Sequence, residues 1–257
     1  MDSITLASRS YDFESAIEPL EIDEDPSGLL RGGVGSTIWD AAIVLSKYLE
    51  KSAIVSLASS ASRPINVLEL GSGTGIVGLA VARILSGNKL MAGSRVVLTD
   101  KDNVLPLLQR NVEKNASAGI SIEARILDWE AVSGVRAPGS SVEAAGEKED
   151  AISDSMPPVT YEDIVNVDWD LVIVSDCIWV PALYASLIGA INTIISPRDK
   201  TQLVVAFEKR NFSEEMEFFA MLGKTFRFRD IKPEEQDGNY QSEDIFLFVC
   251  QRRHIEN

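Results

Sequence analysis

The chain has 257 residues, of which 45% are hydrophobic, so it is long enough to bury one large core, and its composition is ordinary for a soluble globular protein. It carries 24 Lys and Arg against 39 Asp and Glu, and this net charge of −15 disfavours nucleic acid and favours a basic protein surface or a cationic small molecule as partner. The absence of a long apolar run, of a signal-peptide pattern and of paired cysteines (only Cys177 and Cys250) predicts no membrane span, no disulfide framework and a reducing compartment.

Helices and strands alternate in the predicted order of elements. Residues 34–50 (VGSTIWDAAIVLSKYLE) predict an amphipathic helix that Ser36 or Thr37 could cap, with Asp40 in its first turn. Apolar runs predict strands and longer amphipathic runs predict helices over the rest of the chain. The strands are 65–70, 94–100, 120–129, 169–176 and 202–210, and the helices are 75–85, 104–115, 181–195 and 213–223. This alternation predicts a mainly parallel sheet with helices on both faces.

The last part of the chain departs from the alternation. Strands over 226–231 and 243–253 are separated by the short polar segment KPEEQDGNYQSE, which leaves no room for a crossover helix. Two strands joined in this way are expected to be antiparallel. We therefore expect an α/β fold with a seven-stranded, mostly parallel sheet whose last strand is antiparallel.

The domain organisation follows from where the pattern begins and where it breaks. Residues 1–30 are expected to be a variable N-terminal segment, and 31–253 a single domain. Within that domain, 131–167 is rich in Ser, Ala, Gly, Pro and acidic residues, which predicts a flexible acidic insertion. The insertion is either an arm that guides a substrate or an inert linker, and composition favours the linker.

The glycine turn LELGSGTG, residues 68–75, follows the first strand of the domain. A dinucleotide-binding turn needs a glycine where Ile76 stands, and a phosphate-binding P-loop needs a lysine where Leu79 stands. No Lys or Arg lies between Val67 and Val81 to meet a phosphate. The turn therefore indicates either tight strand-to-helix packing or close approach of the backbone to a ligand without phosphate.

The pattern E-x-G-x-G-x-G in this turn resembles the S-adenosylmethionine-binding motif of the seven-strand, class I methyltransferases, whose fold is Rossmann-like. The resemblance implies that Gly71, Ser72 and Gly73 lie against the amino-acid moiety of the cofactor. It also implies that Asp100, at the end of the second strand, binds the ribose hydroxyls, and that Asp128 and Trp129 flank the adenine. The alternative for Asp100 is a solvated residue at a strand end.

Three further stretches narrow the resemblance: GGVGSTIWDAAIVLSKYLE, SDCIWVPALY and YQSEDIFLFV. They are similar to the protein-lysine methyltransferases that modify valosin-containing protein, chaperones and elongation factors. The nearest branches are the valosin-containing-protein lysine methyltransferases and the fungal elongation factor 1A lysine methyltransferases. The resemblance implies a monomeric cytoplasmic enzyme that needs no metal and methylates a lysine of elongation factor 1A or of an AAA-ATPase or chaperone type of protein.

The same resemblance implies roles for five more residues. Trp39 packs on the cofactor, Ser175 touches it, and Asp176 faces the substrate amine. Trp179 stands where the family has the tyrosine of its Asp-x-x-Tyr motif, and Glu208 matches an acidic residue of the family. Each has a structural alternative: Trp39 a core aromatic, Asp176 the cap of a helix near residue 181, Trp179 a surface aromatic, and Glu208 half of a salt bridge.

Three rival functions stay open at this point. One is a methyltransferase that acts on a small, nicotinamide-like amine, which requires an enclosed pocket. Another is an interaction module that keeps the fold without catalysis. An NAD-dependent oxidoreductase is opposed by Ile76 in the glycine turn.

Overall fold

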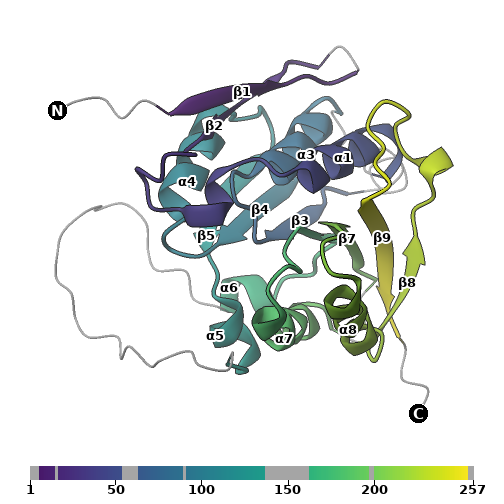
Figure 1. Ribbon diagram of the computed structural model, residues 1–257. Helices are drawn as coiled ribbons and strands as arrows, with labels where there is room; N and C mark the ends of the chain where they lie inside the picture. Colours follow the sequence, from purple (N-terminus) through teal and green to yellow (C-terminus); the bar gives the residue numbers. More distant parts are fainter. Residues whose placement is uncertain are drawn as a thin grey trace, which may run out of the picture.

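The computed structural model describes residues 6–14, 17–53, 63–88, 91–136, 162–196 and 200–253, and its elements are labelled in Figure 1. The strands are β1 (Ala7–Tyr11), β2 (Leu20–Glu24), β3 (Asn66–Leu70), β4 (Arg95–Asp100), β5 (Ser121–Ile126), β6 (Leu171–Ser175), β7 (Gln202–Glu208), β8 (Phe226–Asp230) and β9 (Ile245–Arg252). The helices are α1 (Asp40–Tyr48), α3 (Ile76–Ser86), α4 (Leu105–Lys114), α5 (Trp129–Ser133), α6 (Glu162–Val165), α7 (Tyr184–Ile194) and α8 (Phe212–Leu222).

The main sheet has the strand order β5-β4-β3-β6-β7-β9-β8. β3 to β7 are parallel to their neighbours, whereas β9 runs antiparallel to both β7 and β8. The predicted seven-stranded sheet with an antiparallel last strand is thus confirmed. The chain moves outward from β3 to β4 and β5, and then returns to the other side of β3 with β6. Ligands of open α/β sheets bind at the carboxyl ends of the strands where the order reverses in this way.

Helices cover both faces of the sheet, as the sequence predicts. α1, α3 and α4 lie on one face, and α5 to α8 lie on the other (Figure 1). Successive strand residues point to opposite faces, so Leu171 and Ile173 pack with the first group of helices while Val172 and Val174 pack with the second. None of the helices in the described ranges is long and apolar enough to cross a membrane.

The first helix begins later than the sequence predicts. Asp40 is its first residue and Trp39, in extended conformation, is its N-cap, so the predicted cap by Ser36 or Thr37 is wrong. The preceding segment instead binds the end of β2: the Ile38 N–H donates to Glu24 Oε1 (2.7 Å), and the Asp25 N–H donates to the Ser36 carbonyl (2.8 Å). These contacts hold the segment before α1 out of the helix.

β5 also ends earlier than predicted, at Ile126. Asp128 and Trp129 do not end this strand; Asp128 is the N-cap of α5, and its carboxylate accepts from the Glu130 N–H (2.9 Å). The predicted insertion, 131–167, begins within α5 and ends just after α6. Residues 137–161 lie outside the described residues.

A hairpin that the sequence analysis does not assign occupies part of the N-terminal segment. β1 and β2 pair antiparallel, from Ala7 opposite Glu24 to Tyr11 opposite Leu20. Leu20 and Ile22 are fully buried in the core between the hairpin, α3 and α4. The hairpin within the N-terminal segment is therefore part of the packed structure.

Candidate functional site

A cavity of about 370 Å³ opens at the carboxyl ends of β3, β4 and β6. It collects most of the residues that the sequence analysis singles out as binding or catalytic. These are Trp39, Gly71, Ser72, Gly73, Asp100, Asp128, Trp129, Ser175, Asp176 and Trp179. Glu208 does not line the cavity and is joined to it through Asp176.

The glycine turn forms one wall of the cavity, and other parts of the chain pack closely against its backbone. Gly71 has a φ of 67°, and a Cβ there would lie 2.5 Å from Cys177 Sγ and 3.1 Å from the Trp129 ring. Gly73 has a φ of 53°, and a Cβ there would lie 3.0 Å from the Gly35 carbonyl oxygen. The loop before α1 thus crosses the turn at van der Waals distance, and only glycine fits at both positions.

Asp100 joins this turn to the end of β4. Its carboxylate accepts hydrogen bonds from the Gly73 N–H and the Lys101 N–H, both at 2.7 Å. Burial raises the pKa of Asp100, against the effect of these two hydrogen bonds. Asp100 is therefore a bonded, largely enclosed carboxylate facing the cavity, and not a solvated residue at a strand end.

Glu69, in the same motif, has a role that the sequence analysis does not assign. Its side chain is buried beneath the turn, where Oε2 accepts from the Gly78 N–H of α3 (2.9 Å). Burial raises the pKa of this carboxyl to about 8. A neutral Glu69 avoids a second negative charge directly beneath Asp100.

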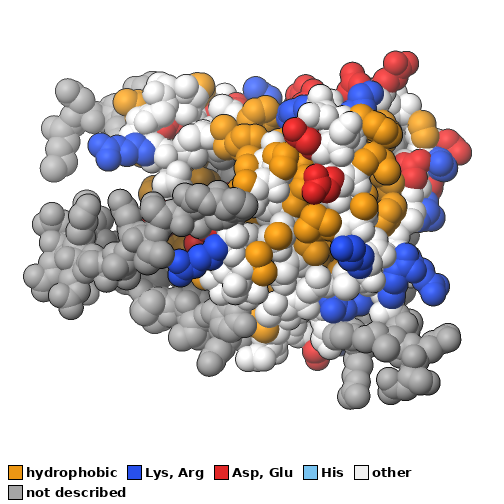
Figure 2. All heavy atoms as spheres, turned by 60° about the horizontal axis from the view of Figure 1, so that its bottom comes forward, with side chains coloured by type: hydrophobic (Ala, Val, Ile, Leu, Met, Phe, Trp, Pro, Cys, Tyr) orange, Lys and Arg blue, Asp and Glu red, His pale blue; other side chains and the backbone are white. Residues whose placement is uncertain are grey.

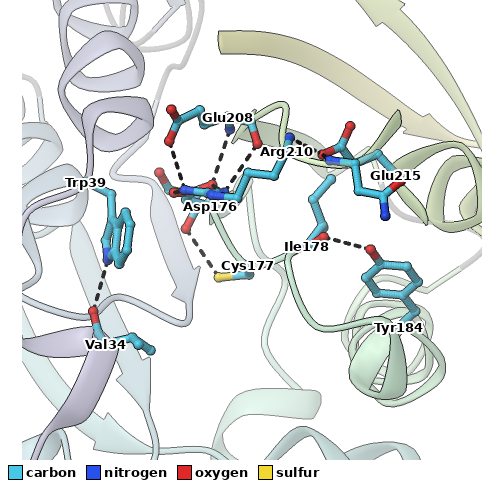
Figure 3. A network of polar contacts seen from close by, with 11 residues as sticks. Val34, Trp39, Asp176, Cys177, Ile178, Tyr184, Glu208, Arg210 and Glu215 are labelled. Carbon is cyan, nitrogen blue, oxygen red and sulfur yellow. Dashed lines mark hydrogen bonds and ion pairs between the residues drawn. The ribbon is translucent and has the colours of Figure 1, made fainter. Parts of the chain in front are cut away.

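Asp176 occupies a sharp turn after β6. Its φ of 54° is in the left-handed region, which non-glycine residues adopt rarely and mostly at functional sites. Its carboxylate, with 4% of the side chain exposed, accepts from Arg210 Nη1 and Nη2 (both 2.7 Å) and from the Glu208 N–H (3.2 Å). Figure 3 shows these contacts converging on Asp176. The following helical turn begins after Val180, so the alternative of a helix cap at Asp176 is wrong.

Two tryptophans stand at the cavity with large exposed faces. Trp39 is 41% exposed, donates from Nε1 to the Val34 carbonyl (2.9 Å), and has the Arg210 guanidinium 5.3 Å from its ring centre (Figure 3). The alternative of a core aromatic at Trp39 is therefore wrong. Trp179 is 49% exposed and lines the cavity beyond Asp176. Both rings offer a flat apolar surface on which a cation can rest.

The Ser175 hydroxyl is buried and has no hydrogen-bond partner among the described residues. Next to it, Cys177 Sγ lies between the Ser175, Leu70 and Gly71 carbonyl groups, and burial raises the pKa of its thiol. A buried hydroxyl without a partner is costly unless a ligand or water bonds to it. Ser175 is thus a polar group in the wall that a ligand can satisfy.

Arg210 is a second residue of the site that the sequence analysis does not assign. Besides Asp176 it binds Glu208, with 2.9 Å between Nη2 and Oε2, so Glu208 does form a salt bridge. Arg210 stands only two residues after Glu208 in the sequence. Its contact with Asp176 could not be read there, because only the pairing of β6 with β7 brings the two side chains together.

The charge of the cavity is predominantly negative. Apart from the neutral Glu69, the acidic residues in its wall are Asp100, Asp128, Glu130 and Asp176, and Lys101 is the only cationic residue among the described residues that line it. In the parts of the chain with described structure, no cluster of three or more His, Cys, Asp or Glu side chains could hold a metal ion. The site suits a ligand that carries positive charge and no phosphate.

Comparison with known proteins agrees with this chemistry. A family model described as lysine methyltransferase matches residues 16–137 and 156–225. The protein-lysine N-methyltransferase EFM6 of Saccharomyces cerevisiae is 31% identical over 242 residues, 91% of this chain and 86% of that protein. The protein N-lysine methyltransferase METTL21A of Mus musculus is 26% identical, over 94% of this chain and 87% of that protein.

Among solved structures, the mitomycin 7-O-methyltransferase MmcR aligns with a TM-score of 0.46 at 14% identity, over 82% of this chain and 54% of that chain. The present chain thus spans about half the length of that enzyme. The family model and the match to EFM6, which covers most of both chains, carry the assignment, and they confirm the resemblance drawn from the residues. The chain belongs to the lysine methyltransferase family and is a methyltransferase that acts on protein lysine.

Proposed function

We propose that this enzyme transfers a methyl group from S-adenosylmethionine to one lysine of a cytoplasmic protein, of the elongation factor 1A or the AAA-ATPase and chaperone type. One observation carries the proposal. The glycine turn, Asp100 and Asp176 follow three adjacent strands and line one cavity. A cofactor site and an amine site are thereby brought side by side.

The residues of the cavity fit this cofactor by their chemistry. S-adenosylmethionine carries a sulfonium and an ammonium group and no phosphate, which suits a wall with several carboxylates and the single cation Lys101 among its described residues. The backbone of Gly71 and Gly73 lines the cavity, and the absence of a Cβ at both lets Trp129, Cys177 and the loop before α1 close around the turn. The unpartnered Ser175 hydroxyl offers a hydrogen bond.

Each of these groups takes one part of the cofactor in the proposal. Gly71, Ser72 and Gly73 lie against its amino-acid moiety, and Asp100 accepts hydrogen bonds from the ribose hydroxyls. The side chains that enclose its remaining parts are Trp39 before α1, Asp128 and Trp129 at the start of α5, and Ser175 at the end of β6.

Bound in this way, the cofactor supplies an electrophilic methyl group. The chain's own residues must then bind the lysine side chain, exclude water around it and let its proton leave to solvent, because only the neutral amine has a lone pair. Trp179 supplies an apolar wall, and Asp176 accepts a hydrogen bond from the amine and orients it. Alignment of this kind can supply several kcal/mol, about 7 or more in favourable cases.

The surface beside the cavity suits a protein substrate. The loop after β6 exposes Trp179 (49%), and α8 exposes Phe212 (68%) and Met216 (49%). Figure 2 shows apolar side chains exposed over the face covered by α7 and α8, with acidic side chains among them. A lysine-bearing basic segment complements both features, whereas a small amine needs an enclosed pocket.

The test is transfer of label from radioactive S-adenosylmethionine to proteins of a cell lysate, with Asp176→Asn as the inactive variant. The expected result is one or two discrete labelled proteins, with methyl-lysine identified by mass spectrometry, and loss of labelling in the variant without loss of cofactor binding. Label confined to small molecules would support the metabolite enzyme. A chain that gives no cofactor-induced thermal shift would be an interaction module.

A further inference from the structure

Arg210 lies where the proposed substrate amine needs a counter-charge. Its guanidinium binds both oxygens of Asp176 at 2.7 Å, binds Glu208 Oε2 at 2.9 Å, and lies 5.3 Å from the centre of the Trp39 ring. Figure 3 shows it between Glu208 and Asp176. This bidentate geometry is the strongest that Arg forms with a carboxylate.

The pairing leaves Asp176 with little capacity for further partners. A carboxylate has about four lone-pair positions, and those of Asp176 accept two hydrogen bonds from Arg210 and one from the Glu208 N–H. One position is left for the amine of a substrate. Asp176 lines the cavity and Arg210 does not, so the arginine binds the carboxylate from behind.

The other charged groups that contact Arg210 are acidic: Glu208 on β7 binds its guanidinium, and Glu215 on α8 accepts from its backbone N–H. Across the cavity lie Asp100 and the cation Lys101. The thiol of Cys177 is protonated, because burial raises its pKa. Without Arg210, a substrate amine would meet uncompensated carboxylates, which stabilise the charged ammonium form.

We propose that Arg210 is a positioning residue that neutralises Asp176, so that the carboxylate orients the substrate lysine without holding it in the unreactive ammonium form. The inference rests on the proposed function and adds to it the control of the amine's charge. Asp176 fixes the direction of one N–H bond, and Arg210 fixes Asp176 and cancels its charge. The proton of the amine then leaves to solvent more readily, and the nitrogen lone pair is free to form the bond to the methyl carbon. The bond from that carbon to the sulfonium sulfur would break in the same step, and the sulfur would leave as a neutral thioether.

The experiment compares Arg210→Gln and Arg210→Lys with Lys209→Gln. Lys209 is the matched control, since it is the neighbouring cation and its Nζ pairs with Asp244 (2.8 Å) and not with Asp176. Initial rates of label transfer from S-adenosylmethionine to total lysate protein are measured from about pH 6.5 to about pH 11, from well below to just above the pKa of free lysine. Circular dichroism and the cofactor-induced thermal shift verify that each variant is folded.

The expected result is a shift of the pH profile. Arg210→Gln should lose roughly tenfold in rate near neutral pH, as one uncompensated charge raises the amine pKa by about one unit. The loss should shrink as the pH passes the pKa of the amine, to about threefold near pH 11, because a free lysine amine with a pKa of about 10.4 is mostly neutral there by itself. Arg210→Lys keeps the charge but not the bidentate pairing, so it should keep the shape of the wild-type pH profile at a lower rate, and Lys209→Gln should match the wild type. An equal loss at every pH, or a faster variant at every pH, would overturn the proposal.

A second measurement does not depend on activity. Binding of n-butylammonium chloride, which mimics the end of a lysine side chain, is followed by tryptophan fluorescence. Arg210→Gln should bind it at least about threefold more tightly than the wild type, because the charge of Asp176 is exposed; equal affinity would contradict the inference. If the wild type binds cofactor but labels no protein, the proposed function fails, and this binding measurement alone decides the role of Arg210.

Discussion

Asp100 ties together the two features that the cofactor site needs, the glycine turn and the end of β4. Its oxygens accept from the Gly73 and Lys101 N–H groups, so removing the side chain leaves a buried donor unsatisfied and deletes the proposed ribose acceptor. A hydrogen bond to a charged group contributes about 1.5–3 kcal/mol. Asp100→Ala should therefore raise the Kd for S-adenosylmethionine roughly ten- to hundredfold, as measured by titration calorimetry.

The control for this variant is Asp102→Ala, two residues along the chain. Asp102 is exposed, and its carboxylate accepts from the Asn103 N–H (2.8 Å). This change should leave cofactor affinity within about twofold of the wild type. Equal affinity of the wild type and Asp100→Ala would remove Asp100 from the cofactor site.

The two cysteines should be unreactive in the folded protein. Burial raises the pKa of the Cys177 thiol far above its usual range and raises that of Cys250 to about 12. Because the thiolate is the reactive form, a thiol reagent added at about pH 8 should modify the native protein slowly and both cysteines at once after unfolding. Rapid modification of Cys177 in the native protein would mean that its thiol is not held against the Leu70, Gly71 and Ser175 carbonyl groups.

At the scale of elements, the N-terminal hairpin is linked to the glycine turn through α4. Asn111 on α4 is the link: its Oδ1 accepts from the Asp23 N–H (2.8 Å), and its Nδ2 donates to the Asp23 and Thr74 carbonyl groups (3.0 and 2.9 Å). One buried amide thus binds β2 and the glycine turn together. Hairpin and cofactor site are expected to respond together when it is removed.

Asn111→Leu keeps a similar volume but loses all three hydrogen bonds and leaves their backbone partners unsatisfied. We expect the free energy of unfolding to fall by about 2–4 kcal/mol, measured by urea titration, and cofactor affinity to fall with it. Glu113→Gln, at an exposed position on the same helix, should change neither quantity. A destabilised Asn111→Leu variant with unchanged affinity would separate the hairpin from the site.

The elements that were predictable from sequence are those whose environment imposes a local pattern. β6 is apolar along Leu171–Ser175 because both faces of the strand are covered, and the glycine turn shows in the sequence because side chains do not fit there. The hairpin was missed because Ala7–Tyr11 is exposed except at Tyr11, and Leu20–Glu24 is acidic. The helical start at Asp128 was missed because its cap follows the strand within two residues.

The site could be predicted only in part, for a related reason. Asp100 and Asp176 each follow a recognisable strand, so their position at the carboxyl edge of the sheet can be deduced. The ion pair of Arg210 with Asp176 joins residues 34 apart in the sequence. It depends on β6 and β7 being neighbours and on the left-handed turn at Asp176, neither of which leaves a local pattern. The resemblance to the family pointed to Asp176 but not to Arg210.

At the scale of the whole molecule, the cost of burying a carboxyl group under the site should appear in the pH dependence of stability. Burial raises the pKa of Glu69 to about 8, whereas an unfolded chain has a Glu pKa of about 4.3. Between these values the folded state keeps a proton that the unfolded state has lost. The free energy of unfolding therefore falls as pH rises through this window, by up to about 1.4 kcal/mol per pH unit, and levels off above pH 8.

Glu69→Gln removes this titration while keeping a side-chain oxygen for the Gly78 N–H. The variant should gain stability relative to the wild type progressively from about pH 5 to about pH 8, measured by urea unfolding across that range. Glu123→Gln is the control of opposite sign. Hydrogen bonds from Arg95 and then Arg125 lower the pKa of Glu123 to about 2, so its contribution is present above about pH 4.3 and is lost as pH falls toward 2. If the difference in free energy of unfolding between Glu69→Gln and the wild type is constant from about pH 5 to about pH 8, Glu69 is ionised in the folded protein. The glycine turn then lies next to two negative charges, those of Glu69 and Asp100, rather than one.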